Sequence, residues 1–262
     1  MSIDLHVDGA IATVTINNPK ELNALDVDHL RDLVQTFEDL GERNDIRAIL
    51  LTGEGDRAFV AGANIKRMSV MSKAEATEFG ELGHAVGRAI ESAPQPVIAV
   101  INGFALGGGC EISLACDMRL CSDNAVFAQP EVGLGIPPGW GGTQRLPRVV
   151  GKGIASELIF TGRRVKADEA LRIGLVNAVH DQSALMGEAY RMAQSVVKNS
   201  PAAVRLSKRL IADIENYGYE EGLRREGQAF AAVFESHDQR EGMTAFVEKR
   251  EAVFQDGEES DQ

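Results

Sequence analysis

The stretch of residues 96–145 constrains the fold more than any other part of this sequence. It begins with an apolar, β-branched run, Pro96–Ile101, which predicts a buried strand. A glycine-dense turn over Gly103–Gly109 follows, and then a helical pattern over Cys110–Cys116. A strand that passes through glycines into a helix exposes backbone N–H groups at the helix N-terminus, where they favour developing negative charge. The stretch therefore predicts an α/β unit that presents free amides.

Two glutamates lie beside such amides. Glu111 falls in the first turn of the predicted helix, and Glu131 lies in a turn-like segment just before a second glycine group within residues 139–142. A glutamate in a first turn is commonly only a partner of the helix dipole, and glutamates in loops are mostly solvated. Two carboxylates beside two sets of exposed amides, however, favour acid–base chemistry around an oxyanion.

The motifs of this chain resemble those of the crotonase (enoyl-CoA hydratase/isomerase) superfamily. The stretches that carry the resemblance are Val14–Leu25 (VTINNPKELNAL), Ala58–Met68 (AFVAGANIKRM), Ile101–Glu111 (INGFALGGGCE), Gln129–Leu146 (QPEVGLGIPPGWGGTQRL) and Asp238–Phe254 (DQREGMTAFVEKREAVF). They occur in the family's order and spacing and cover essentially the whole chain. The resemblance is therefore far more specific than a lone glycine motif.

The fold expected from the resemblance is the crotonase (ClpP/crotonase-like) α/β fold, a superhelix of ββα units with a C-terminal helical oligomerisation region. The patterns alone predict an open α/β fold followed by a helical appendage, because no strand signal follows Pro201. We expect residues 1–200 to form the core for acyl-CoA binding and catalysis. Residues 201–262 are expected to form the helical region for trimerisation, with a disordered acidic tail at Asp256–Gln262. The family forms trimers, usually paired into hexamers, so a homotrimer or a dimer of trimers is implied.

Elsewhere the chain alternates strand and helix signals. Asp8-Gly9 between two apolar runs predicts a β-hairpin, and Asp26 predicts the N-cap of a helix. Lys73–Ser92 also has helical spacing. The regularity of this last helix is made less certain by three glycines: Gly80, Gly83 and Gly87.

Hydration of an enoyl thioester needs a base that activates water at the β-carbon, an acid that protonates the α-carbon, and donors that stabilise the thioester oxygen. The resemblance implies that Glu111 and Glu131 are the two catalytic carboxylates, on either side of one water. Glu131 is expected to exchange a proton with the α-carbon and Glu111 to activate the water, although the two can share this work. The backbone N–H groups of Ala63 and Gly108 would form the oxyanion hole.

Further residues are implied to bind the substrate: Ala61, Asn64, Ile65, Lys66, Gly139, Trp140 and Lys249. Lys66 and Lys249 match positions that meet coenzyme A phosphates, Lys249 from a neighbouring subunit; solvated surface lysines are the alternative. Gly139 would place an amide near the water and Trp140 would shape the acyl pocket, with an ordinary turn and simple packing as their alternatives. Asn64 departs from the aspartate that is usual in the family, but asparagine can keep the local hydrogen bonds of a turn.

Composition limits the partners and cofactors. The formal net charge of −12 argues against nonspecific binding to nucleic acid or to an anionic membrane. No N-terminal apolar run is long enough for a signal peptide or a membrane span, so a cytoplasmic protein is expected. The three cysteines, Cys110, Cys116 and Cys121, fit neither a disulfide framework nor a zinc site. With no metal-ligand spacing among the histidines, we expect no metal and no cofactor, coenzyme A being part of the substrate.

Alternative functions divide into those of the same family and those of other classes. A Δ3,Δ2-enoyl-CoA isomerase needs only one well-placed base, so the two glutamates favour a hydratase. Such an enzyme is a hydro-lyase that acts reversibly on 2-trans-enoyl-CoA, in fatty-acid β-oxidation or an allied acyl-CoA pathway. Hydrolases, decarboxylases and dehalogenases of this fold usually alter one of the two positions. RNA-binding members present a lysine-rich helix, whereas Asp28–Arg43 is acidic on balance. Gly103–Gly109 does not fit GxGxxG, and no GK[ST] is present. A Cys110 nucleophile has no histidine near it in sequence.

Overall fold

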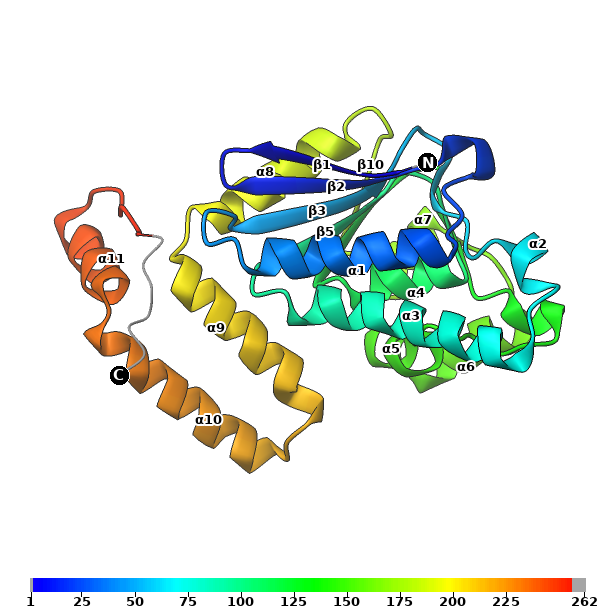
Figure 1. Ribbon diagram of the computed structural model, residues 1–262. Coiled ribbons are helices and arrows are strands. Elements are labelled where there is room, and N and C mark those ends of the chain that lie inside the picture. Colours follow the sequence, from blue (N-terminus) through cyan, green and yellow to red (C-terminus); the bar gives the residue numbers. More distant parts are fainter. Residues whose placement is uncertain (1, 256–262) are drawn as a thin grey trace.

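The strands of this protein form two sheets in the computed structural model, which describes residues 2–255 (Figure 1). The six-stranded sheet contains, in spatial order, β1 (Ser2–Asp8), β2 (Ile11–Asn17), β3 (Ala48–Gly53), β5 (Val97–Ile101), β7 (Met118–Ser122) and β10 (Ala178–His180). The four-stranded sheet contains β4 (Ala58–Val60), β6 (Phe104–Leu106), β8 (Val126–Ala128) and β9 (Val165–Lys166). β1 and β2 form the predicted hairpin, and every other neighbouring pair in the larger sheet is parallel.

The chain passes repeatedly from the larger sheet to the smaller one. β3 is followed by β4, β5 by β6 and β7 by β8, and each pair leads into helical segments. These helices are α1 (Val27–Gly41), α2 (Ile65–Met68), α3 (Lys73–Ser92), α4 (Gly108–Ala115), α5 (Gly142–Val150), α6 (Lys152–Thr161), α7 (Ala167–Arg172), α8 (Leu185–Val197), α9 (Pro201–Ala212), α10 (Tyr219–Ala232) and α11 (His237–Glu248). Short 3-10 helices are η1 (Pro19–Glu21), η2 (Glu131–Leu134), η3 (Asp213–Glu215) and η4 (Val233–Glu235). The repeat of two strands and helical structure is the ββα unit that the resemblance implies.

The larger sheet is buried on both faces, because alternate residues of its strands enter two different cores. In β3, Ile49 and Leu51 belong to the main core with the residues of α1, α3 and α4. Leu50 belongs to a second core, in which α8 contributes Leu185 and Ala189. Figure 1 shows α8 on the opposite side of the sheet from α1 and α3. The sequence patterns gave no prediction for α8.

Two local differences from the sequence prediction concern glycines. α3 is one continuous helix, with a capping box between Ser72 and Glu75, so the expected weakening of its regularity by glycine is wrong. The turn predicted over Gly103–Gly109 contains a short strand, β6, and α4 begins at Gly108, two residues earlier than predicted. Gly108 is consequently a helical residue, at the N-terminus whose free amides matter for the site.

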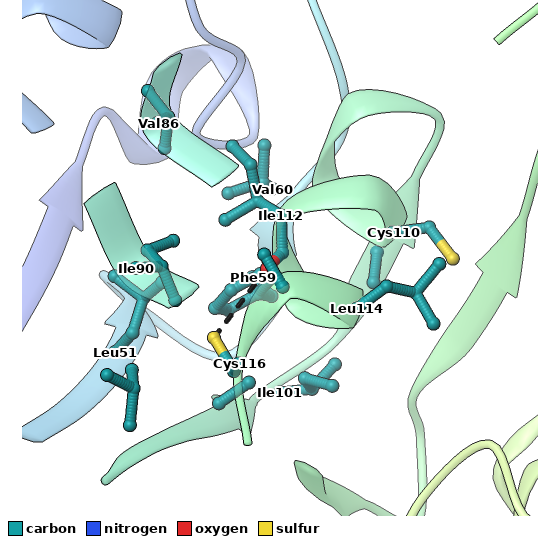
Figure 2. Packing of buried hydrophobic residues seen from close by; sticks show 14 of the residues in the cluster. Leu51, Phe59, Val60, Val86, Ile90, Ile101, Cys110, Ile112, Leu114 and Cys116 are labelled. Carbon is teal, nitrogen blue, oxygen red and sulfur yellow. Dashed lines mark hydrogen bonds between the residues drawn. The ribbon is translucent and has the colours of Figure 1, made fainter. Parts of the chain in front are cut away.

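Helix α4 lies in the middle of the main core, and all of its residues are buried. Figure 2 shows apolar side chains from several elements around it, together with the hydrogen bond from the Cys116 thiol to the Ile112 carbonyl at 3.6 Å. The thiols of Cys110 and Cys116 lie on different sides of the helix (Figure 2), and the three cysteines are free and buried. Burial raises the pKa of the Cys110 thiol to about 12. A nucleophilic Cys110 is therefore excluded, because its thiolate is not populated near neutral pH.

The C-terminal helices α9, α10 and α11 extend away from the two sheets (Figure 1). α9 is fastened to the core by Lys208, whose buried ammonium lies 2.8 Å from the Asp117 carboxylate and donates to the Gln95 carbonyl at 2.9 Å. α10 buries none of its residues. The expected acidic tail, Asp256–Gln262, lies outside the described residues. Within residues 2–255, no helix is both long and apolar enough to cross a membrane.

Candidate active site

A cavity of about 300 Å³ lies where the segment after β4, the N-terminus of α4 and the segment after β8 meet. Glu111 and Glu131 both line it, although twenty positions separate them in the sequence. Most of the other lining residues are apolar and come from α2, α3 and the loop before α5: Ile65, Met68, Phe79, Ile136, Pro137 and Trp140. A larger hollow of about 560 Å³ under α9 contains none of the predicted site residues. The smaller cavity is therefore the candidate active site.

Glu111 is held by backbone amides of the loop that precedes α5. Its Oε1 accepts hydrogen bonds from the N–H groups of Trp140 at 2.8 Å and Gly142 at 2.7 Å. The side chain is buried, and this burial raises its pKa, while the amides of Gly142, Trp140 and Gly139 act in the opposite direction. Both of these hydrogen bonds are accepted by the same oxygen, Oε1. Glu111 is thus a desolvated carboxylate with a fixed orientation.

Glu131 is less well supplied with donors. It is the first residue of η2 and is 8% exposed. Burial raises its pKa to about 7, and the charge of Glu111 adds to the rise. With the amide of Gln129 oriented to satisfy both groups, its nitrogen donates to the two carboxylate oxygens at 3.1 and 3.2 Å. A carboxyl group with this pKa exchanges protons readily near neutral pH.

Gly107 makes room for the Glu131 carboxylate. Its φ is +51°, and a Cβ atom on it would lie 2.6 Å from the Glu131 Oε1. Both the backbone conformation and the contact require glycine at this position. Gly107 and Gln129 are site residues to which the sequence analysis assigned no role, although both lie in the stretches that carry the family resemblance. Only their contacts with Glu131 indicate what they do.

Ala63 and Gly108, the predicted oxyanion donors, both line the cavity. Gly108 is the first residue of α4, so its N–H has no acceptor within the helix. In the segment after β4, Leu25 donates to the Gly62 carbonyl and accepts from the Asn64 N–H, both at 2.9 Å. These bonds fix the loop on either side of Ala63, whose own N–H makes no backbone hydrogen bond within the described residues. Ala63 and Gly108 follow two neighbouring parallel strands, β4 and β6, and both line the cavity.

Trp140 is 5% exposed and packs between helices α3 and α4. A Cβ atom on Gly83 of α3, or on Gly108 of α4, would overlap its indole ring. Phe79 meets the ring edge to face, with the two centroids 5.3 Å apart. The absence of a side chain at position 108 thus makes room for the indole. The glycines of α3 are thus explained by packing that the local sequence does not reveal.

Arg145 of α5 supports the same loop from behind. It donates from Nη1 to the Trp140 carbonyl at 2.8 Å and binds the two oxygens of Glu91 at 2.6 and 2.8 Å. A Cβ atom on Gly87 of α3 would lie 2.5 Å from the guanidinium. The backbone of Trp140 is therefore fixed at both ends, by Glu111 at its N–H and by Arg145 at its carbonyl.

The remaining predicted substrate-binding residues divide into two groups. Ala61, Ile65 and Gly139 line the cavity. The others do not: Asn64 caps α2 by accepting the Arg67 N–H at 3.3 Å, Lys66 is exposed on α2, and Lys249 ends α11. Figure 1 places α11 and α2 at opposite ends of the molecule, so one chain does not bring Lys249 to its own cavity. No group of three or more His, Cys, Asp or Glu residues that could hold a metal ion occurs in the part of the chain that the structure describes.

Known proteins similar to this chain are named as hydratases of enoyl-CoA thioesters. The family described as enoyl-CoA hydratase/isomerase matches residues 6–257. The chain is 50% identical over 249 residues to the short-chain-enoyl-CoA hydratase of Clostridium acetobutylicum, with 95% of each covered. It is 46% identical over 253 residues to the crotonyl-CoA hydratase of Syntrophomonas wolfei, with 97% of each covered.

Solved structures agree with this fold over nearly the whole chain. The enoyl-CoA hydratase of Bacillus anthracis superimposes with a TM-score of 0.95 at 38% identity, over 98% of this chain and 100% of that one. The DspI protein of Pseudomonas aeruginosa gives a TM-score of 0.94 at 38% identity, over 97% of this chain and 96% of that one. The fold predicted from the sequence motifs is confirmed.

Proposed function

The chain belongs to the enoyl-CoA hydratase/isomerase family, and on this basis we propose that its cavity binds a 2-trans-enoyl-CoA thioester for the reversible addition of water. The protein is an enoyl-CoA hydratase, a hydro-lyase with the crotonase fold, and the product is a 3-hydroxyacyl-CoA. The observation that carries the mechanism is the convergence of Glu111 and Glu131 on one cavity beside the N-terminus of α4. Two carboxylates on one cavity favour hydration over double-bond isomerisation, which needs one base.

The two carboxylates take different roles because their environments differ. Glu111, whose Oε1 accepts two backbone N–H groups, is the ionised partner that removes a proton from water as the oxygen bonds to the β-carbon. Glu131, with its pKa raised to about 7, is the protonated partner that delivers a proton to the α-carbon. In the reverse direction each group does the opposite. Because both face the same cavity, oxygen and proton reach the same face of the double bond, which gives syn addition.

The amides of Ala63 and Gly108 are proposed to bind the thioester oxygen while it carries enolate charge. Both residues line the cavity, and Gly108 adds the favourable end of the α4 dipole. Lys66, next to the cavity-lining Ile65, is proposed to meet a phosphate of coenzyme A, and Lys249 of a neighbouring subunit is proposed as a second such contact. No cofactor beyond the coenzyme A of the substrate is proposed.

The C-terminal helices are proposed to pack against neighbouring subunits in a homotrimer or a dimer of trimers. The support is their exposed apolar surface: Phe230 of α10 is 64% exposed, and Phe246 of α11 is 85% exposed. Large apolar side chains gathered on one region are typical of a protein interface. We further propose that the enzyme works in the cytoplasm, in fatty-acid β-oxidation or an allied acyl-CoA pathway. Light scattering of the purified protein tests the assembly: a mass of one chain would exclude it.

The hydratase proposal is tested by mixing the purified protein with crotonyl-CoA and following the ultraviolet absorbance of the conjugated thioester. Rapid loss of absorbance with 3-hydroxybutyryl-CoA as product is the expected result. Glu111→Gln and Glu131→Gln should each lose most of the activity while keeping the fold, checked by circular dichroism. Near-normal turnover by either variant would remove that residue from its proposed role. A protein that hydrates no enoyl-CoA and binds no coenzyme A would overturn the proposal.

A further inference from the structure

We propose that Trp140 closes the far end of the acyl cavity, so that the enzyme is selective for enoyl-CoA substrates with a short acyl chain of about four to six carbons. This inference rests on the proposed function and specifies its substrate class. It is carried by the position of the indole relative to Glu111 and by the glycines that accommodate the ring.

The first step concerns where the acyl chain must go. Glu111 acts at the β-carbon, and its Oε1 is bound by the N–H of Trp140 at 2.8 Å. The side chain of Trp140 therefore begins next to the carboxylate that acts at the β-carbon. We infer that acyl carbons beyond this atom pass toward Phe79, Gly80 and the indole, all of which line the cavity.

The second step concerns what blocks the way. The indole fills the space between α3 and α4: a single Cβ atom on Gly83 or on Gly108 would overlap it. Phe79 stands behind it with a centroid distance of 5.3 Å. Interiors packed to this density have no room for further methylenes. An extended chain thus meets an aromatic wall within a few carbons of the reacting double bond.

The third step concerns whether the wall can move aside. The backbone of Trp140 is tied at its N–H to Glu111 and at its carbonyl to Arg145, whose guanidinium is in turn bound by both oxygens of Glu91. Displacing the residue would therefore disturb Glu111 itself. The ring has glycine surfaces on two sides and an aromatic edge on a third. The length limit is accordingly a fixed property of the site.

Truncating the ring tests the limit directly. Trp140→Ala opens a space between Gly83 and Gly108 that is continuous with the cavity, whereas Trp140→Phe opens a smaller one. We expect the ratio of kcat/KM for 2-octenoyl-CoA to that for crotonyl-CoA to rise at least about ten-fold in Trp140→Ala and less in Trp140→Phe. Each methylene that becomes buried is worth about four-fold in this ratio. Phe37→Leu, a buried change in α1 that does not line the cavity, is the matched control and should leave the ratio unchanged.

A binding experiment tests the same inference without catalysis. Trp140 is the single tryptophan of the chain, so the intrinsic tryptophan emission reports on this position alone. Saturated butyryl-CoA, which cannot react, should shift the emission of the wild-type protein, and free coenzyme A should not. This measurement stands even if Trp140→Ala does not fold.

The outcomes separate the two proposals. Wild-type protein that hydrates octenoyl-CoA as well as crotonyl-CoA, or Trp140→Ala with an unchanged ratio, would overturn the length limit and leave the hydratase function intact. Butyryl-CoA that binds by calorimetry without altering the emission would also overturn it. If no enoyl-CoA is hydrated, the proposed function fails, and the emission titration still decides whether the acyl chain reaches Trp140.

Discussion

Replacing Glu131 by glutamine is expected to stabilise the folded protein above neutral pH while removing most of its activity. The native side chain is a carboxylate that water reaches poorly, being 8% exposed. Burial, with the neighbouring charge of Glu111, raises its pKa from 4.5 to about 7. Glutamine has a similar shape and no charge to desolvate. The site therefore gives up stability in order to hold an acid that works near neutral pH.

The magnitude follows from the pKa. A rise from 4.5 to about 7 corresponds to roughly 3 kcal/mol at 1.36 kcal/mol per unit. Because Glu131 lines the cavity and is not fully buried, solvent screening reduces the expected effect to about 1–2 kcal/mol. The folded protein holds this proton more tightly than the unfolded chain does, so the free energy of unfolding falls as pH rises from 4.5 to 7 and the loss is complete above 7. The gain from Glu131→Gln should therefore be absent at pH 4.5 and full at pH 8.

The assay is urea denaturation of wild-type protein and Glu131→Gln at pH 4.5 and pH 8, at one protein concentration so that assembly is constant. Glu241→Gln is the control with the opposite sign, because hydrogen bonds from Arg250 hold the pKa of the half-buried Glu241 at about 2. This control should lose stability at pH 8 while Glu131→Gln gains it. A Glu131→Gln variant no more stable than wild type at pH 8, or equally stabilised at both pH values, would refute the reasoning.

Three further predictions follow from the same contacts. The pH profiles of kcat/KM for hydration and for dehydration should have the same bell shape, with an alkaline limb near pH 7. The overall equilibrium releases no proton, and both directions need Glu111 and Glu131 with one proton between them. Different alkaline limbs in initial-rate assays of the two directions would contradict this. Gly107→Ala should lower kcat/KM about 100-fold in the crotonyl-CoA assay and leave the circular dichroism spectrum unchanged. The cause is the new Cβ atom, which would lie 2.6 Å from the Glu131 Oε1. A loss below about three-fold would contradict the packing argument. Lys208→Met should lower the free energy of unfolding by about 3 kcal/mol in urea titrations, as it leaves Asp117 unpaired; a change under about 1 kcal/mol would show that α9 is held by other contacts.

The local parts of the fold could be predicted because their causes are local. Asp8-Gly9 forms the expected hairpin turn, with Asp8 paired to Ile11. Asp26 caps α1 as expected, accepting N–H groups of the first turn. The two cavity glutamates were found by their positions relative to glycine turns and by family motifs. Features of this kind need only a few consecutive residues to be recognised.

Features set by distant contacts could not be predicted in the same way. α8 packs on the far face of the larger sheet, and its own sequence did not predict this helix. Gly83 and Gly87 count against a helix when α3 is considered alone. In the folded protein they face the Trp140 indole and the Arg145 guanidinium, from a different part of the chain. Their helix cost is offset by the burial of an aromatic ring.

The same limit explains why the residues alone do not order the two glutamates, whose expected roles came from the family resemblance. Glu111 and Glu131 are chemically identical, and both are buried on one cavity. What separates them is the donor set: two backbone N–H groups bind one oxygen of Glu111, whereas the side-chain amide of Gln129 meets Glu131. Amide donors favour the ionised form, so this difference supports the proposal that Glu111 acts as the base and Glu131 as the acid. The order of the pair is thus a property of the loop around Trp140, which also sets the length of the acyl cavity.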